Sequence, residues 1–464
     1  MHIQHRKLPL VLSAAAALLL GGCATDTVMP KEDISALQAK QSHPAHYAAS
    51  YIGGKVQDNW LRTFHDKTLN RLVNEAQQHN PDIKIAAQRI AQAEAIMRYT
   101  GTAMMPQLNL QGSYTQRSWE AQGKHGRGNI VLALNWEPDI WGKISHQTKR
   151  DAFAMEAQSA YYAWARESLA ANTAKLWFLV ASDRMIYEFA NQVVTIQSKA
   201  QHILDQRAKI GQGNMRDVHM SRAMVAEAKE TRTAALSAKE RDTRALEVLV
   251  GRYPANALHA KRLPRVPVRV PSGIPADLLN RRPDIIAAQY QVAAAFHNTK
   301  AVELLRLPRI TLSGQAGVDV IQDTMAKLIG GLFMPIFDAG AIQAQIDAAS
   351  AEQKIAIENY RNTVLNAYEE VENALALEGQ LASRYAYIST MVKEYKTTYD
   401  MTKANYEIGQ GTYIDVLTVQ AKWISAQIQK LQIHKARLVN RVNLHLALGG
   451  SFDISESQSV EKGK

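Results

Sequence analysis

The sequence predicts a mixed α/β fold made of two tandem structural repeats, over residues 61–252 and 276–450. Three observations lead to this prediction. Short segments recur in the same order in both halves, each half contains two stretches with the period of two that is typical of β-strands, and each half continues into a helical stretch far longer than an ordinary globular helix. Together they predict a duplicated unit with a β-hairpin and a long helical hairpin.

The duplication is visible in four pairs of segments. IGQGNMRDVH at Ile210–His219 returns as IGQGTYIDVL at Ile408–Leu417, 198 residues later. NPDI, MPQLNLQG and LNWEPDIWGKI return in the same order as RPDI, LPRITLSG and LFMPIFDAGAI, at offsets of 198 or 202 residues. A period of this length indicates a duplicated domain half and not a solenoid unit.

Residues 1–22 have the features of a secretory signal peptide, with a short basic region before an apolar run from Leu8 to Leu20. That run is too short to span a bilayer comfortably as a permanent helix. LGGC at Leu20–Cys23 resembles the lipobox of bacterial lipoproteins, which implies that Cys23 is diacylated and becomes the first residue of the mature chain. By the sorting rules of such lipoproteins, Ala24 permits transport to the outer membrane. The alternative is an incidental cysteine behind an ordinary signal peptide.

The composition bears on possible partners. A net charge of +11 invites a nucleic acid partner, but no Lys/Arg stretch is dense enough to follow phosphates, and an exported chain meets no nucleic acid substrate. Cys23 is the only cysteine, so disulfides cannot stabilise the fold.

Residues 23–60 are polar and predict an extended tether. Its histidines, His43 and His46, are expected to be solvated and not to bind a metal.

The first repeat begins with a helical stretch and then changes to strand periodicity. Apolar residues at helical spacing predict a helix over Leu69–Ala103 that is interrupted near Pro81. Within residues 106–142, polar and apolar residues alternate in two runs of about ten residues, which predicts a hairpin with a loop rich in Gly, Lys and His. Three tryptophans fall towards the strand ends, where interfacial aromatics of membrane strands lie: Trp119, Trp136 and Trp141.

The second repeat predicts the same order of elements. Residues 308–338 contain an alternating run from Ile310 to Asp319 and a more apolar strand at Lys327–Phe337. Four strands are too few to close a transmembrane barrel, for which about eight are the minimum, and a sheet in lipid cannot have an open edge. The chain therefore needs copies of itself, or its strands lie outside a membrane.

A very long helix follows each hairpin. Residues Ile144–Ala208 and Ala341–Tyr406 contain no proline, and roughly 65 residues correspond to about 100 Å of helix. The IGQG segments end these helices, and return helices are predicted over Asp217–Val250 and Asp415–Leu448. Spacings of four and three predict a coiled-coil seam on the second return helix, broken only by a lysine: Leu417, Ala421, Ile424, Ile428, Leu431, Lys435, Leu438 and Val442.

The remaining stretches connect or end the repeats. Five prolines in residues 253–275 exclude a helix or a central strand and predict a linker between the halves. Residues 451–464 form a polar tail. The sequence contains no HExxH, P-loop, GxSxG or CxxC motif, and its histidines lack ligand spacing. It therefore predicts neither an enzyme nor a bound metal or cofactor.

The order of these elements, together with RPDI at Arg282–Ile285 and IFDAG at Ile336–Gly340, resembles the outer membrane factor family. These are the TolC-like channels of tripartite efflux pumps, and the lipobox points to their lipoprotein branch. The resemblance implies a homotrimer in which twelve strands, four per chain, close one outer membrane barrel and the helices continue it as a periplasmic tunnel. It also implies two partners, a periplasmic adaptor (membrane fusion protein) and an inner membrane transporter that mainly determines the cargo. Cys23 would anchor the chain in outer membrane lipid.

A barrel of this kind would need a polar lining, and one face of the predicted strands supplies it. The polar residues on that face are Asn109, Gln111, Thr115, Asn135, Thr311, Ser313 and Gln315. Such a lining suits a passive, weakly selective, water-filled pore better than a ligand pocket.

The resemblance also implies a gate at the periplasmic tip, where an acidic ring narrows the pore. Asp415 matches the aspartate of that ring and Tyr406 a tyrosine of the gate contacts, whereas Thr418 stands where some relatives have a second aspartate. Like charges around one axis attract cations and disfavour anions. The alternative role for Asp415 is purely structural, as a capping box with Thr412.

Both tip turns contain two glycines, namely Gly211, Gly213, Gly409 and Gly411. They are predicted to supply the left-handed conformations that end one helix and start the next, and the resemblance implies that the adaptor contacts them. A capping box of Asn214 and Asp217 is predicted in the first repeat. There Arg216 stands where the second repeat has Ile414, so the two turns need not share the gate equally.

A function of another class remains open at this point. The chain could be a periplasmic coiled-coil scaffold or adaptor lipoprotein without a pore, whose strands pack as a soluble domain. The hairpins discriminate between the two, because such a scaffold has no need for alternating, aromatic-ended strands of membrane-spanning length.

Overall fold

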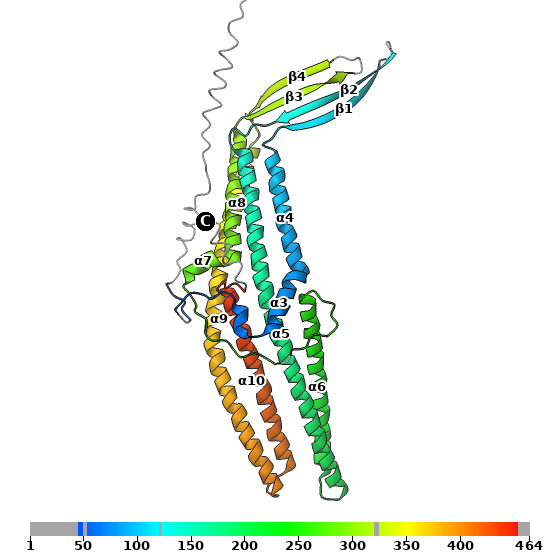
Figure 1. Ribbon diagram of the computed structural model, residues 1–464, viewed down its shortest axis with the longest axis vertical. Helices are drawn as coiled ribbons and strands as arrows, with labels where there is room; N and C mark the ends of the chain where they lie inside the picture. Colours follow the sequence, from blue (N-terminus) through cyan, green and yellow to red (C-terminus); the bar gives the residue numbers. More distant parts are fainter. Residues whose placement is uncertain (1–44, 50–52, 120–122, 261, 320–323, 453–464) are drawn as a thin grey trace, which may run out of the picture. The chain divides into compact units, whose positions relative to one another are not determined.

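The computed structural model describes residues 45–49, 53–119, 123–260, 262–319 and 324–452. Helices and strands follow each other in the predicted order (Figure 1). The elements are η1 (Trp60–Phe64), α3 (Lys67–His79), α4 (Pro81–Thr102), β1 (Gln107–Trp119), β2 (Gly123–Trp136), α5 (Lys143–Lys209), α6 (Met215–Leu249), η2 (Pro275–Asp277), α7 (Leu278–Arg281), α8 (Pro283–Glu303), η3 (Leu304–Arg306), β3 (Arg309–Asp319), β4 (Thr324–Phe333), α9 (Ala341–Glu407) and α10 (Tyr413–Ala447).

The four strands form one antiparallel sheet in the order β1-β2-β3-β4 (Figure 1). The register places Leu134 between Leu108 and Gly314, so one face of the sheet is apolar. Neighbouring residues along each strand point to the other face, where Asn135 lies opposite Ser313. The apolar face exposes large side chains on the single chain: Leu108, Leu110, Tyr114, Ile130, Leu132, Leu328 and Leu332.

Both hairpins differ from the prediction near their turns. The stretch predicted as a loop belongs to β2, which begins at Gly123 and pairs with β1 as far as Trp119. Ladder hydrogen bonds use backbone groups, so the pairing continues through glycines and polar residues that give no strand signal. Strand β4 covers Thr324–Phe333 and not Lys327–Phe337. It ends before Pro335, which has no N–H to donate.

The two long helices, α5 and α9, contain 67 residues each, and the return helices α6 and α10 contain 35 each. At 1.5 Å per residue, α5 and α9 are each about 100 Å long. The return helices begin two residues earlier than predicted, at Met215 and Tyr413, because Asn214 and Thr412 are their N-caps. No helix in the described part of the chain is both long and apolar enough to cross a bilayer.

The chain divides into two compact units, each of which takes segments from both repeats. The first unit contains residues 88–159 and 287–362, and therefore the sheet and the helical segments that lead into it. The second takes its described residues from 43–87, 160–286 and 363–464. It holds the hydrophobic core, whose largest buried members include Trp60, Phe64, Leu69, Leu72, Phe178, Leu246 and Leu438.

The seam predicted on α10 is confirmed at every seventh position, at Leu417, Ile424, Leu431 and Leu438, which are buried. The prediction is wrong for Ala421, which is exposed, because the face that α10 buries within one chain is narrower than a full heptad seam. Lys435, the break in the seam, is half-buried. Its charge acts on two buried acids, Asp183 of α5 and Asp242 of α6.

The first residue of the NPDI segment and that of the RPDI segment each donate a side-chain hydrogen bond to a carbonyl oxygen near the C-terminal end of the return helix in the same repeat. In the first, Asn80 Nδ2 donates a hydrogen bond of 2.8 Å to the Leu249 carbonyl oxygen, near the end of α6. In the second, the Arg282 guanidinium donates one of 3.2 Å to the Ala447 carbonyl oxygen, at the end of α10. The last carbonyls of a helix have no partner within it, so both segments close the bundle at a return helix.

Arg282 also joins several elements of the second unit. Its side chain is 2% exposed, and it bonds Asp284 at 2.6 and 3.0 Å and Glu370 of α9 at 2.7 Å. The ring of Trp164 on α5 lies 4.8 Å from the guanidinium carbon. The planar fork of arginine can make these contacts at once, which a lysine cannot.

Residues 253–275 are held by side chains of the helices. Arg184 of α5 donates a hydrogen bond of 2.9 Å to the Ala260 carbonyl oxygen. Arg441 of α10, which is 2% exposed, donates one of 3.1 Å to the Pro267 carbonyl oxygen. A proline-rich segment cannot pair its own backbone groups, so helix side chains satisfy them.

Candidate functional site

The polar face of the sheet is the candidate pore lining. Ser113 donates to Asn129 across β1 and β2, and Ser313 Oγ lies 3.2 Å from Asn135 Oδ1 across β3 and β2. Lys327 of β4, opposite Gln315, adds a basic group that the sequence did not indicate as lining. Six of the seven predicted lining residues share this face by register: Asn109, Gln111, Asn135, Thr311, Ser313 and Gln315. The side chain of the seventh, Thr115, lies outside the described residues.

Two of the three predicted interfacial tryptophans are tied to the backbone where the sheet meets the helices. Trp136 Nε1 donates a hydrogen bond of 3.0 Å to Met104 O, and Trp141 Nε1 donates one of 2.7 Å to Pro308 O. An apolar ring with a satisfied N–H is typical of the boundary between lipid and water. The side chain of Trp119 lies outside the described residues.

Only one glycine of each tip turn adopts the predicted left-handed conformation. Gly211 has a φ of 75° and Gly409 a φ of 81°. At Gly213 a Cβ atom would lie 2.7 Å from the backbone nitrogen of Ala208, so this glycine permits a close backbone approach. At Gly411 the nearest atom would be 3.9 Å away. The prediction of a left-handed conformation is therefore wrong for Gly213 and Gly411.

Asp415 and Thr412 form a complete capping box. Thr412 Oγ1 accepts from Asp415 N at 3.2 Å, and Asp415 Oδ2 accepts from Thr412 N at 3.2 Å and from Thr412 Oγ1 at 2.6 Å. In the first repeat, Asn214 accepts from Arg216 N at 2.9 Å, whereas the Asp217 carboxylate lies 3.5 Å from the Arg216 guanidinium. The box predicted there is not formed: Asn214 caps the helix through the amide of Arg216 and not that of Asp217, and the Asp217 carboxylate faces the Arg216 guanidinium instead of the Asn214 N–H.

Tyr406 contacts the tips of both helical hairpins. Its ring centroid lies 5.0 Å from that of Tyr413, and the guanidinium carbon of Arg207, at the end of α5, lies 5.3 Å from it. The second contact joins the hairpin of the first repeat to that of the second. Thr418 is engaged within its own helix, since its hydroxyl donates to Ile414 O at 2.8 Å.

Sequence reasoning missed Arg207. A basic residue in the last turn of a helix ordinarily complements the helix dipole, and nothing local distinguishes Arg207 from Lys209. Only the tertiary structure brings it over the ring of Tyr406.

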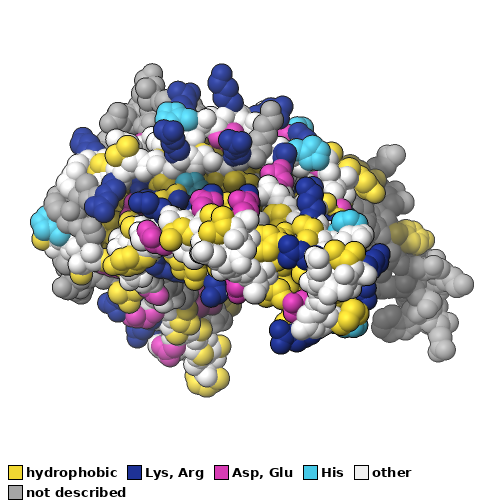
Figure 2. Space-filling model, turned by 90° about the horizontal axis from the view of Figure 1, so that it is seen from below, with side chains coloured by type: hydrophobic (Ala, Val, Ile, Leu, Met, Phe, Trp, Pro, Cys, Tyr) yellow, Lys and Arg dark blue, Asp and Glu magenta, His cyan; other side chains and the backbone are white. Residues whose placement is uncertain are grey.

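The surface seen from the ends of the helical hairpins carries both signs of charge. Lysine and arginine side chains are interspersed with aspartate and glutamate on this face (Figure 2). Such a mixed surface differs from the single-sign stripe that follows a phosphate backbone.

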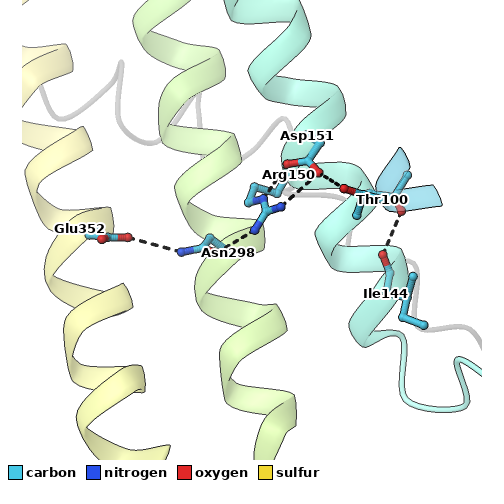
Figure 3. Close-up of polar contacts among 7 residues, drawn as sticks. Thr100, Ile144, Arg150, Asp151, Asn298 and Glu352 are labelled. Carbon is cyan, nitrogen blue, oxygen red and sulfur yellow. Dashed lines mark hydrogen bonds and ion pairs between the residues drawn. The ribbon is translucent and has the colours of Figure 1, made fainter. Parts of the chain in front are cut away.

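A chain of polar contacts crosses four helices of the first unit (Figure 3). Thr100 of α4 donates to Asp151 of α5 at 2.5 Å, and Arg150 bonds the same carboxylate at 2.7 and 3.1 Å. Arg150 also reaches Asn298 of α8 at 3.5 Å, and Asn298 donates to Glu352 of α9 at 3.4 Å. Burial pushes the pKa of Asp151 up, but the bonds from Arg150 and Thr100 outweigh it and hold that pKa below its usual value. This arrangement ties helices together and leaves no free base.

The described residues contain no group of three or more His, Cys, Asp or Glu side chains that could hold a metal ion. His146 and His297 come closest, with their Nδ1 atoms 2.9 Å apart. That is a hydrogen-bond distance, and it is shorter than the about 3.3 Å that separates two nitrogens bound at 2.0–2.1 Å to one tetrahedral zinc ion. Cys23, the predicted lipidation site, lies outside the described residues.

An antiparallel sheet with one apolar and one polar face, joined to two long helical hairpins, defines a channel of the outer membrane that continues into the periplasm. The chain belongs to the outer membrane efflux protein family, whose model matches residues 72–252 and 274–450.

Individual relatives match over nearly their whole length. The solvent efflux pump outer membrane protein SrpC of Pseudomonas putida is 27% identical over 477 residues, which cover 95% of this chain and 98% of the relative. The cation efflux system protein CusC of Escherichia coli is 24% identical over 468 residues, covering 95% and 98%. The solved structure of the Campylobacter jejuni CmeC outer membrane channel superposes with a TM-score of 0.83 at 21% identity, covering 91% of this chain and 96% of that one.

These findings confirm the predicted family, the channel fold, the outer membrane location and the function as an efflux channel component. The alternative of a scaffold or adaptor without a pore finds no support, because the matched family is one of outer membrane efflux proteins. That family consists of transport channels and is not a family of enzymes.

Proposed function

We propose that three copies of this chain close one barrel and form the passive exit duct of a tripartite efflux pump. The open sheet is the observation that carries this proposal, because β1 and β4 each have one hydrogen-bonded neighbour among the described strands of the chain. In lipid, open strand edges would leave N–H and C=O groups unpaired. Twelve strands from three copies exceed the about eight of the smallest barrels.

An inner membrane transporter and a periplasmic adaptor supply this duct in the proposal. The adaptor contacts the tip turns at Gly211, Gly213, Gly409 and Gly411, and acylated Cys23 anchors the chain in the outer membrane. The names of the relatives range from solvent efflux to cation efflux. A polar, weakly selective lining is compatible with such varied cargo, so the transporter is proposed to select what passes.

Extraction and conductance test this proposal. Protein from outer membrane fractions is expected to run as a detergent-dependent trimer that heating converts to a monomer, and to form stable pores in planar bilayers. A Cys23→Ser variant is expected to lose its acyl group and keep the pore. A water-soluble monomer without conductance would contradict the proposal.

Three copies of Asp415 form the acidic constriction at the periplasmic tip in the same proposal. The side chain is exposed on the single chain, and its capping bonds orient it at the start of α10. The Arg207 contact to Tyr406 holds the two hairpin tips of one chain together and favours the closed state. Both residues stand at the helix ends that a gate would move.

Replacing Asp415 with asparagine is expected to lower the preference of the pore for cations over anions severalfold and to weaken block by multivalent cations. The reason is that the ring formed by the three copies loses three negative charges. Asparagine can still accept the bond from Thr412 N, so the change tests charge and not capping. The readout is the reversal potential and the block of single channels. Asp217→Asn is the matched control, because Asp217 is paired with Arg216. Equal selectivity in wild type and Asp415→Asn would leave Asp415 as a helix cap only.

Replacing Arg207 with alanine is expected to raise the open probability of single channels by about two- to fivefold, which corresponds to losing one exposed cation–π contact of about 0.5–1 kcal/mol. Tyr406→Leu is expected to have the same effect, and the double variant no larger one, because both changes remove one contact. Tyr406→Phe keeps an aromatic ring and is the control. Additive effects of the two substitutions would show that they act separately.

A further inference from the structure

The linker between the two repeats carries charge of one sign that the channel function does not use. Residues 253–275 contain four lysines and arginines and no aspartate or glutamate. The structure describes three of these basic side chains, Arg262, Arg265 and Arg269, and all three are exposed. We call them the linker arginines. A surface segment of this kind attracts anions from outside the segment.

The linker arginines are presented from a backbone that is held in place. Leu263 and Val266, which lie between them in the sequence, pack against the hydrophobic core of the second unit. The Pro264 carbonyl oxygen lies 2.8 Å from His434 Nε2, and the Pro267 carbonyl accepts a hydrogen bond from α10. Because the apolar residues of the linker are turned to the core, the arginines face solvent.

The acids beside the linker are already paired. Glu378 of α9 forms an ion pair with Arg441 of α10. Glu188 of α5 pairs at 2.9 Å with Arg184, which also bonds the linker carbonyl of Ala260. None of the linker arginines has an acidic partner among the residues that the structure describes. Their charge is therefore available to a partner outside the chain.

Helix α10 adds two basic groups to this surface. Lys430 Nζ and the guanidinium carbon of Arg437 lie 5.3 and 4.9 Å from the centre of the Tyr385 ring, and neither group pairs with an acid in the described part of the chain. Burial lowers the pKa of Arg441, and the charges of Arg437 and Arg269 lower it further against the effect of its ion pair. Charges from α10 and from the linker thus act on one group and form one basic surface.

The position of this surface along α9 excludes the head groups of the outer membrane as its anions. Tyr385 follows the first residue of α9, Ala341, by 385 minus 341, or 44 residues. At 1.5 Å per residue this is about 65 Å of helix, whereas exposed charges are screened beyond about 8–10 Å. The basic surface therefore meets anions of the periplasm.

The same surface lacks the apolar centre that is typical of a protein–protein interface. Among the large apolar residues of the linker between Arg262 and Val270, Val268 alone is exposed, at 90%, in the described part of that stretch. Exposed guanidinium groups without an apolar centre suit a hydrated polymer that carries carboxylates, because the planar fork binds a carboxylate through two parallel hydrogen bonds.

We propose that the linker arginines, with Lys430 and Arg437, bind peptidoglycan, the periplasmic cell-wall polymer whose peptide stems carry free carboxylates. This inference rests on the proposed function in one respect, because the linker must lie on the outside of the duct. A proline-rich segment inside the duct would obstruct it. The contact holds the duct where it passes through the cell wall.

The experiment uses the full-length protein in detergent and purified peptidoglycan sacculi, which are sedimented together. Wild type is expected to sediment with the sacculi and to be released when the salt concentration rises from about 0.05 to about 0.5 M. A triple variant, Arg262→Gln with Arg265→Gln and Arg269→Gln, is expected to bind about five- to tenfold more weakly, by loss of three exposed ion pairs. Sacculi whose carboxylates have been amidated are expected to bind neither protein.

The matched control removes the same charge from scattered positions. It combines Lys199→Gln, Lys229→Gln and Lys422→Gln, which are exposed on α5, α6 and α10 and have no acidic partner among the described residues. Its affinity for sacculi is expected to change by less than about twofold. Equal losses in the two triple variants would show that net charge alone attracts the protein, which refutes the site.

Conductance and trimer content are measured on the same preparations. Absence of both from wild type would refute the proposed function. If pores and trimers are intact but wild type and the arginine variant bind sacculi equally, peptidoglycan binding by the linker is refuted. Binding to amidated sacculi as strong as to untreated ones would overturn the assignment to carboxylates. If the arginine variant keeps its binding to sacculi and loses efflux in cells, a protein partner uses the linker, which also overturns the proposal.

Discussion

Replacing Arg282 with alanine is expected to lower the free energy of unfolding by about 3 kcal/mol. This is the lower end of the range for removing one partner of a buried ion pair, because Glu370 is 55% exposed and can be solvated when its partner is lost. The loss would remove the side-chain donor of the Ala447 carbonyl and leave Asp284 with only the bond from Ile285 N. The measurement is denaturant unfolding of the purified protein in detergent, followed by far-ultraviolet circular dichroism.

Asn80→Ala is the matched control, since it removes the equivalent bond in the first repeat, and the cap of α4 that Asn80 provides to Asp82 N and Ile83 N, without removing a charge. It is expected to cost about 2 kcal/mol, from about 1 kcal/mol for a neutral hydrogen bond and about 1 kcal/mol for a helix N-cap. Arg282→Lys is expected to fall between wild type and Arg282→Ala, because lysine keeps the charge and loses the fork. Equal losses for Arg282→Ala and Asn80→Ala would contradict the role assigned to the buried charge.

Raising the pH from 6 to 8 is expected to destabilise the packing of α5, α6 and α10 by about 1 kcal/mol. Burial, and then the bond to Asp242, raises the pKa of Asp183 from 3.8 to about 7. The folded state therefore holds a proton that the unfolded state releases, and this contribution to stability is present below pH 3.8 and is lost as the pH rises through about 7. Burial also pushes the pKa of Asp242 up, but the bonds from Arg241 and Asp183 hold it below its usual value. Asp242 thus weakens the fold only in strong acid.

Asp183→Asn is expected to flatten this pH dependence and to make the protein more stable than wild type at pH 8, because asparagine keeps a polar group in place without a buried charge. Lys435→Met is expected to have the opposite effect and to steepen the loss of stability with rising pH. The positive ammonium group stabilises the ionised forms of both acids and lowers their pKa values, so removing it raises the pKa of Asp183 further. Unfolding midpoints of the three proteins at pH 6 and pH 8 provide the test. A slope in Asp183→Asn equal to that of wild type would show that another group is responsible.

Much of the architecture could be predicted because its signals are local. The change from a period of 3.6 to a period of 2 after Pro106 marks the start of the first hairpin. Prolines and glycines mark the linker and the helix ends. The capping box of Thr412 and Asp415 is likewise contained in four consecutive residues.

The errors occurred where backbone pairing or chain geometry overrides local preference. Residues after Gly123 carry no strand signal, yet they pair with β1 because backbone groups make the ladder. Ala421 fits the heptad spacing, but within one chain the packed stripe of α10 does not include it. A Cβ atom at Gly213 would lie 2.7 Å from the Ala208 backbone nitrogen. Residue propensities do not reveal such a distance between atoms of different residues.

The sequence by itself determined the duplicated order of hairpin, long helix and return helix, the two faces of the sheet and the resemblance to a family of channels, because periodicity and repeated segments are properties of the chain alone. Only the tertiary structure decided which charges meet. Arg282 with Glu370, Arg207 with Tyr406, and Lys435 with Asp183 and Asp242 come from distant parts of the chain. A side chain shows its partners only after folding brings them within a few ångströms, where burial strengthens their electrostatic interaction.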